Sequence, residues 1–148
     1  MLIIYSDQEI EALVQERKPL PKDWRNQLLS PNKKKRELFV IGDKGNKFRI
    51  IIRQNDFRPS DFSVILAVLI RSPNRNFRIR RYNGWTSRHR NRLEREIING
   101  FHIHFATERY QRRGLKEDTY AQQTERYSDC EGALHCLIVD ANFQESPQ

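Results

Sequence analysis

Residues 78–111 read RIRRYNGWTSRHRNRLEREIINGFHIHFATERYQ, and the rest of the chain is interpreted outward from this stretch. Two kinds of residue alternate near its end, namely Phe101, Ile103 and Phe105 against His102 and His104. Successive side chains on a strand point to opposite faces of its sheet. The pattern therefore predicts a strand with one apolar face and one histidine face.

A second strand is expected just upstream, at residues 76–82. In this strand Arg80 and Tyr82 fall on the face opposite the apolar residues. If the two strands are neighbours, their apolar faces pack together as core. The sequence then predicts that Arg80 and Tyr82 share a cleft with His102 and His104, on the other face of the sheet.

The connection between these two strands covers residues 83–99 and is too long for a tight hairpin. It is rich in arginine and contains His89, so we expect it to fold over the polar cleft. Leu93 and Ile97 are four residues apart, which predicts a short helix within the connection.

The remaining sequence predicts three more strands and helices at both ends of the chain. The expected strands cover residues 38–41, 47–53, 62–70, 76–82 and 100–106. The expected helices follow capping boxes at Ser6–Glu9 and Ser128–Glu131, or cover residues 22–29 and 116–127. The fold class is therefore α+β, a five-stranded antiparallel sheet with N-terminal and C-terminal helices packed on it. We expect a single domain, residues 1–148.

Positive charge is concentrated in the middle of the chain. The formal net charge is +8, and residues 71–113 contribute +9 from twelve arginines and three glutamates. A second basic run, residues 31–36, is interpreted as a solvated loop. Arginine presents planar, bidentate donors that suit phosphates and bases, so RNA or another nucleic acid is the expected partner.

The sequence also bears on the compartment. Cys130 and Cys136 are the only cysteines, which favours two free thiols in a reducing environment. The first residues lack the pattern of a signal peptide, and no run of 18 apolar residues exists. We therefore expect a cytoplasmic protein without a membrane partner.

The histidines and arginines together suggest phosphodiester chemistry. Histidine titrates near neutrality, arginine holds phosphate, and RNA supplies its own nucleophile, the 2′-hydroxyl. The candidate catalytic residues are His89, His102, His104, Arg80, Tyr82 and Arg109. The candidate nucleic-acid-binding residues are Arg78, Arg81, Trp85, Arg88, Arg90, Arg92, Arg112 and Arg113. A purely structural role for the histidines is an equal alternative.

A metal is the less favoured interpretation of the histidine pair. His102 and His104 project the same way from a strand, as two metal ligands would. The many arginines around them oppose a divalent cation. We therefore expect no metal and no cofactor.

The run RYNG, a lone histidine and then GFHIHFATERYQ resembles an uncharacterised bacterial domain family of unknown function. More distantly, it resembles the TumE-type toxins of toxin–antitoxin pairs. The toxin pattern maps only onto Arg81, Tyr82, Asn83, His89, His102 and His104. Two differences from it are that Asn83 stands where an acid is usual and that His89 is single.

The resemblance implies a toxin-like protein that acts on RNA, with metal-independent ribonuclease activity as the specific reaction. It also implies an antitoxin as a partner, and a homodimer is compatible with it. The alternative is a non-enzymatic nucleic-acid-binding or regulatory module, which needs only the arginine-rich patch.

Overall fold

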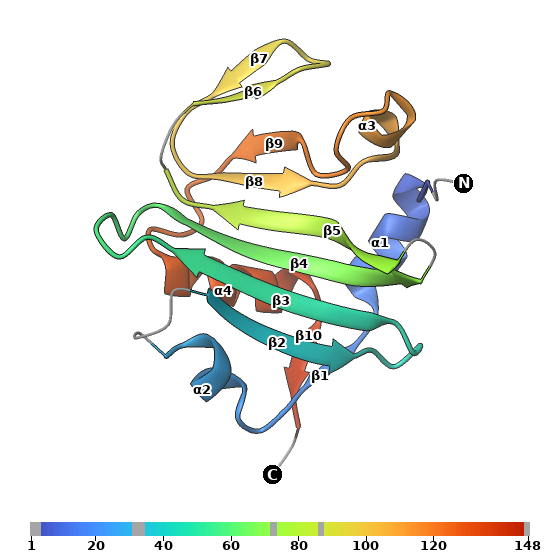
Figure 1. Cartoon of the computed structure of the whole chain (residues 1–148), viewed down its shortest axis with the longest axis vertical. Helices are drawn as coiled ribbons and strands as arrows, with labels where there is room; N and C mark the ends of the chain where they lie inside the picture. Colours follow the sequence, from blue (N-terminus) through green and yellow to red (C-terminus); the bar gives the residue numbers. More distant parts are fainter. Residues whose placement is uncertain (1–3, 31–34, 72–73, 86–87, 147–148) are drawn as a thin grey trace.

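A computed structural model describes residues 4–30, 35–71, 74–85 and 88–146, with an antiparallel sheet at its centre (Figure 1). Within this part of the chain the sheet has six strands in the order β2-β3-β4-β5-β8-β9. Their bounds are Lys35–Ile41 (β2), Lys47–Gln54 (β3), Phe62–Arg71 (β4), Asn74–Asn83 (β5), His102–Phe105 (β8) and Tyr120–Gln123 (β9). The expected α+β class is confirmed, and the expected strand number of five is corrected to six.

Two smaller sheets accompany the large one. The hairpin of β6 (His89–Asn91) and β7 (Glu96–Ile98) is inserted between β5 and β8. A parallel pair joins β1 (Lys18–Leu20), which follows α1, to β10 (Phe143–Glu145) near the C-terminal end of the described chain. The helices of the described residues are α1 (Asp7–Gln15), α2 (Trp24–Leu28), α3 (Glu108–Arg112) and α4 (Cys130–Asp140).

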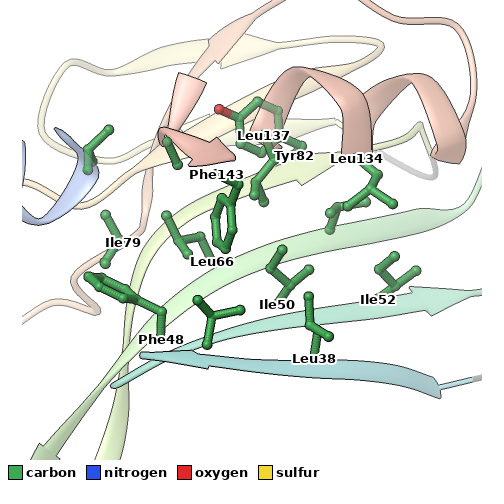
Figure 2. Packing of buried hydrophobic residues seen from close by; sticks show 14 of the residues in the cluster. Leu38, Phe48, Ile50, Ile52, Leu66, Ile79, Tyr82, Leu134, Leu137 and Phe143 are labelled. Atoms are coloured by element: carbon green, nitrogen blue, oxygen red, sulfur yellow. The ribbon is translucent and has the colours of Figure 1, made fainter. Parts of the chain in front are cut away.

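The hydrophobic core lies on one face of the six-stranded sheet. In Figure 1, α4 lies behind the strands, and Figure 2 shows Leu134 and Leu137 of α4 pointing toward the sheet. Alternate residues of each strand point into this core, including Ile50, Ile52 and Leu66. We call this the core face, and the opposite side of the sheet the outer face.

The N-terminal helix forms as its sequence predicts. Ser6 accepts a hydrogen bond from the Glu9 amide, and the Glu9 carboxylate accepts one from the Ser6 amide. This capping box satisfies two backbone donors that a helix start otherwise leaves unpaired. Ile10, Leu13 and Val14 are buried as expected.

The expected alternation along β5 is broken by a β-bulge. Leu66 pairs with Arg80 but Ala67 pairs with Arg78, so Ile79 is one extra residue on β5. An extra residue moves every later side chain to the opposite face. Arg80 and Tyr82 therefore lie on the core face.

Three local expectations for helices are wrong. Residues 93–97 do not form a helix, because Arg95 adopts a left-handed backbone (φ 57°) in the turn of the β6–β7 hairpin. Residues 116–127 are not helical, because β9 pairs with β8 and completes the sheet. The last helix is capped one residue later than expected, with the Asp129 side chain accepting from the Gly132 amide.

The expectations for the basic loop and for membrane spans remain. Residues 31–34 of the basic loop lie outside the described residues. In the part of the chain that is described, no helix has the length and apolarity needed to cross a membrane.

Candidate functional site

The histidine face predicted for β8 exists, but it is covered. His102 and His104 lie on the outer face and are only 5% and 2% exposed. Their neighbours across β5 are Asn83 and Arg81. The predicted grouping of the histidines with Arg80 and Tyr82 is therefore wrong, because the β-bulge at Ile79 reverses the alternation between the two pairs.

The β6–β7 hairpin supplies the cover, together with a third imidazole. The ring centre of His89 lies 4.6 Å from that of His104 and 5.7 Å from that of His102. The rings of His102 and His104 are 4.9 Å apart. The chain connection thus folds over the histidine face as expected, with His89 at the contact.

Each imidazole is held by a backbone carbonyl. His89 Nε2 lies 2.7 Å from the Thr119 oxygen, and His102 Nδ1 lies 2.8 Å from the Gly100 oxygen. His104 Nδ1 lies 2.8 Å from the Asp118 oxygen. A carbonyl only accepts, so each of these nitrogens carries the hydrogen, and one tautomer of each neutral ring is selected.

Burial keeps the two β8 histidines neutral. It lowers the pKa of His104 to about 2, and the charge of Arg81 adds to this shift. Burial also lowers the pKa of His102, against the effect of its bond to Gly100. A lowered pKa leaves a neutral imidazole without an acidic proton to donate near neutral pH and makes it a weaker base, which weakens the case for these two rings as general acid and base.

Arg80 and Tyr82 form a different group on the core face. The Tyr82 hydroxyl donates to Asp140 Oδ2 at 2.6 Å, and Arg80 Nη1 lies 3.9 Å from the same oxygen. Arg126 forms two further bonds to this carboxylate, at 2.8 Å each. Burial raises the pKa of the Tyr82 hydroxyl, so it stays protonated. These contacts attach α4 to β5 and are structural.

Arg78 and Arg81 lie on the outer face and share one carboxylate. Their Nε atoms lie 3.4 Å and 3.2 Å from Asp118 Oδ2, and Asp118 is itself almost fully buried. Sequence analysis missed Asp118 because it follows an irregular loop. Two guanidinium groups around one carboxylate leave net positive charge on this part of the outer face.

The other expected site residues lie farther along the chain. Arg109 pairs with Glu94 at the end of the hairpin, and Arg112 pairs with Glu108 within α3 at 2.6 Å. Arg113 and Trp85 are exposed, and Trp85 is 56% exposed. Arg109 is therefore engaged with Glu94 and with the rings of Tyr110 and Tyr120, contacts that hold the hairpin.

The hairpin has two distinct faces because β6 alternates. His89 and Asn91 point inward, whereas Arg88, Arg90 and Arg92 are exposed on the opposite side. Among the residues the structure describes, no carboxylate lies within ion-pair distance of these three arginines. We call Arg88, Arg90, Arg92 and Arg95 the hairpin arginines.

The inward face of the hairpin is anchored by Asn91. Its side-chain oxygen accepts from the Ala121 amide at 2.8 Å, and its amide group donates to the Ala121 carbonyl at 2.7 Å. It also donates to Glu96 at 2.9 Å. The Asn91 side chain thus pairs with the backbone of Ala121 as a neighbouring strand would, and it fixes the hairpin against the edge strand β9.

A cleft of about 430 Å³ lies farther along the outer face. It is lined by Ile51, Arg53, Ile65, Arg75, Asn76, Arg78, Lys116 and Glu117. The one sign of this cleft in the sequence is Ile51, an apolar residue at an outward position of β3 between Arg49 and Arg53. That signal becomes informative only when β4 and the loop after α3 are placed beside it.

Metal binding finds no support in the described residues. Within them, no group of three or more histidine, cysteine, aspartate or glutamate side chains is arranged to hold a metal ion. Each of the three imidazoles has one ring nitrogen engaged with a backbone carbonyl.

Comparison with known proteins adds no assignment. No family model, no curated protein and no solved structure matches this chain.

Proposed function

We propose that this protein binds nucleic acid through the exposed side of the β6–β7 hairpin. The single observation that supports this most is the alternation along β6, which presents Arg88, Arg90 and Arg92 on one exposed face. The inward alternates, His89 and Asn91, anchor the strand to the sheet.

The charge of the hairpin supports this proposal. Its two acidic side chains are already engaged, since Glu94 bonds to Tyr110 and pairs with Arg109, and Glu96 accepts from Asn91. The hairpin arginines therefore present unneutralised guanidinium groups. Such groups contact phosphates and guanine edges with two parallel hydrogen bonds.

The shape of the hairpin also suits a nucleic-acid partner. A two-stranded β-ribbon is one of the elements that the major groove of a duplex admits, and an arginine-rich ribbon also follows a single strand. Ile97, exposed beside Arg90 in the β6–β7 register, adds an apolar contact for a base.

RNA cleavage in a toxin-like role is the second candidate, favoured by the gathering of three imidazoles within about 6 Å of each other. The burial of two of these rings makes it the weaker candidate. It predicts fragmented RNA and a growth defect on expression, both lost in His89→Gln. Intact RNA with the wild-type protein eliminates it and leaves the binding proposal standing.

The binding proposal is tested by the salt dependence of RNA affinity, measured by fluorescence anisotropy. Replacing Arg90 and Arg92 by glutamine is expected to reduce the slope of log K against log salt by about two, because each lost phosphate contact reduces it by about one. A matched control replaces Lys22 and Lys44, which are exposed on other elements, and has the same net charge. Equal slopes for both double variants would overturn the hairpin as the binding surface.

A further inference from the structure

The cleft on the outer face combines an apolar floor with cationic walls. Ile51 of β3 and Ile65 of β4 pair with each other across the sheet and form the floor. They are 8% and 2% exposed, yet neither belongs to the hydrophobic core on the other face. The floor is therefore a separate apolar surface, which the surrounding side chains almost fully cover, so a ligand reaches it only where those side chains move aside.

The walls of the cleft carry more positive than negative charge. Arg53 and Lys116 are exposed, and among the described residues neither has a carboxylate within ion-pair distance. Arg78 shares the Asp118 carboxylate with Arg81. Glu117 is the one acid among the residues that line the cleft, and it pairs with Arg75 at 3.4 Å.

Arg81 does not line the cleft, but it neighbours Arg78 through the shared Asp118 carboxylate and adds positive charge beside the wall. Burial lowers the pKa of Arg81, and the nearby charges of Arg78 and Arg53 contribute. The Nε atom of Arg81 and Oδ2 of Asp118 are both buried and form no hydrogen bond. An anionic group at the mouth of the cleft, close to Arg53, would relieve this repulsion.

We propose that this cleft receives one unpaired nucleotide of the bound strand. Its base lies against Ile51 and Ile65, and its phosphate lies between Arg53 and Lys116. The volume of about 430 Å³ falls in the range of small-molecule sites, which combine apolar surface with a few placed polar groups. The inference rests on the proposed function and adds that the preferred partner is single-stranded.

Single-strand preference follows from the depth of the site. The bases of a duplex are stacked and paired, so none reaches a recessed floor without the cost of being flipped out. An unpaired base avoids the cost of flipping and, once the covering side chains move, gains apolar contact and cation–π contact with arginine. A duplex still contacts the hairpin arginines through its phosphates.

The first experiment compares an oligouridine of about 12 nucleotides with an RNA duplex of the same length. The wild-type protein is expected to bind the single strand about tenfold more tightly, the size of one favourable base contact. Replacing Arg53 and Lys116 by glutamine should remove most of this preference, whereas the Lys22/Lys44 double variant should retain it. Equal affinities in the wild type, or an unchanged preference in the cleft variant, would overturn the inference.

The second experiment observes the floor directly through the methyl resonances of Ile51 and Ile65. Uridine monophosphate and the oligouridine are both expected to shift these resonances by the ring current of the base. A shift with the oligouridine alone supports a site that needs a strand. A shift of the same size with inorganic phosphate would contradict the placement of the base.

Failure of this inference is distinct from failure of the proposed function. If the hairpin double variant loses salt-dependent RNA binding while the cleft variant behaves as the wild type, the hairpin proposal stands and the cleft inference falls. If neither variant differs from the control, both fall.

Discussion

Arg81 lies opposite His104 in the register of β5 and β8, so a permanent cation neighbours a buried imidazole. Protonation of His104 would place two positive charges side by side in a region with little access to water. Asp118 contacts both the His104 and the Arg81 side chains. Its backbone carbonyl accepts a hydrogen bond from His104, and its carboxylate lies beside Arg81. This pair couples the stability of the outer face to pH.

The free energy of unfolding is expected to fall as pH falls below about 6.5. The pKa of His104 is about 2 in the folded protein and about 6.5 in the unfolded chain, so between these values only the unfolded chain binds the proton. The contribution of His104 to the free energy of unfolding is fully present above the unfolded pKa. It is lost as pH falls, at up to about 1.4 kcal/mol per pH unit.

Urea unfolding at several pH values between about 4.5 and 7.5 measures this dependence. His104→Asn should reduce the slope, while substitution of the exposed His135 by asparagine should leave it unchanged. Parallel curves for the wild type and His104→Asn would contradict the assignment of the slope to His104.

Both faces of β8 should be sensitive to truncation. Ile103→Ala is expected to cost about 2–5 kcal/mol as a core truncation. The sequence alone places the His104 ring in a cleft on the face opposite the core, where its truncation would cost little. The buried position of His104 and its bond to Asp118 instead predict a loss of about 1–3 kcal/mol. Thermal or urea unfolding of both variants decides this, and a negligible loss for His104→Ala would mean that the hairpin does not cover the ring in solution.

Periodicity predicted most of the large sheet but not the composition of the site. The run of apolar residues in β4 and the alternation in β3 and β8 are visible locally, because burial on one or two faces sets the period of each strand. The bulge at Ile79 leaves no such trace. One extra residue in a strand looks like ordinary sequence, yet it moved Arg80 and Tyr82 to the core face.

The last third of the chain was predicted less well because its structure depends on distant partners. Tyr120 and Thr124 have helical spacing, but pairing of β9 with β8 outweighs that weak local preference. Asn91 bonds to Ala121, about 30 positions away, and Asp118 bonds to His104, about 14 positions away. No local sequence pattern marks contacts of this kind. The folding of the connection over the histidine face, by contrast, was expected from its length and its content of arginine and histidine.

Asn91→Ala is expected to detach the hairpin from β9. The substitution leaves the amide and carbonyl of Ala121 without their partners, and such a loss costs about 1–3 kcal/mol. Hydrogen exchange at the Ala121 amide should accelerate, and RNA affinity should fall although no arginine has been removed. Asn99→Ala, at an exposed position just after β7, is the control and should change neither quantity. Unchanged exchange at Ala121 in Asn91→Ala would show that the hairpin is held by other contacts.

Lys18 is expected to be the most costly charged residue to replace. Its ammonium group is fully buried and lies 2.7–2.9 Å from the carbonyl oxygens of Leu13, Val14, Glu16 and Ala141, which share its three N–H donors. It also lies 4.4 Å from the centre of the Phe48 ring. Since these carbonyls end α1 and α4, one cation joins the C-terminal ends of two helices that are far apart in the chain.

Lys18→Met retains most of the apolar stem and removes the donor. The four carbonyls then lose a partner in a buried site, and we expect a loss of about 3 kcal/mol or more in the free energy of unfolding. Lys22→Met, at an exposed position four residues later, should change it by less than about 0.5 kcal/mol. Urea unfolding of the two variants provides the comparison. If Lys18→Met were as stable as the wild type, the desolvation cost of the buried ammonium would equal the value of its hydrogen bonds, and Lys18 would not be what holds the ends of α1 and α4 together.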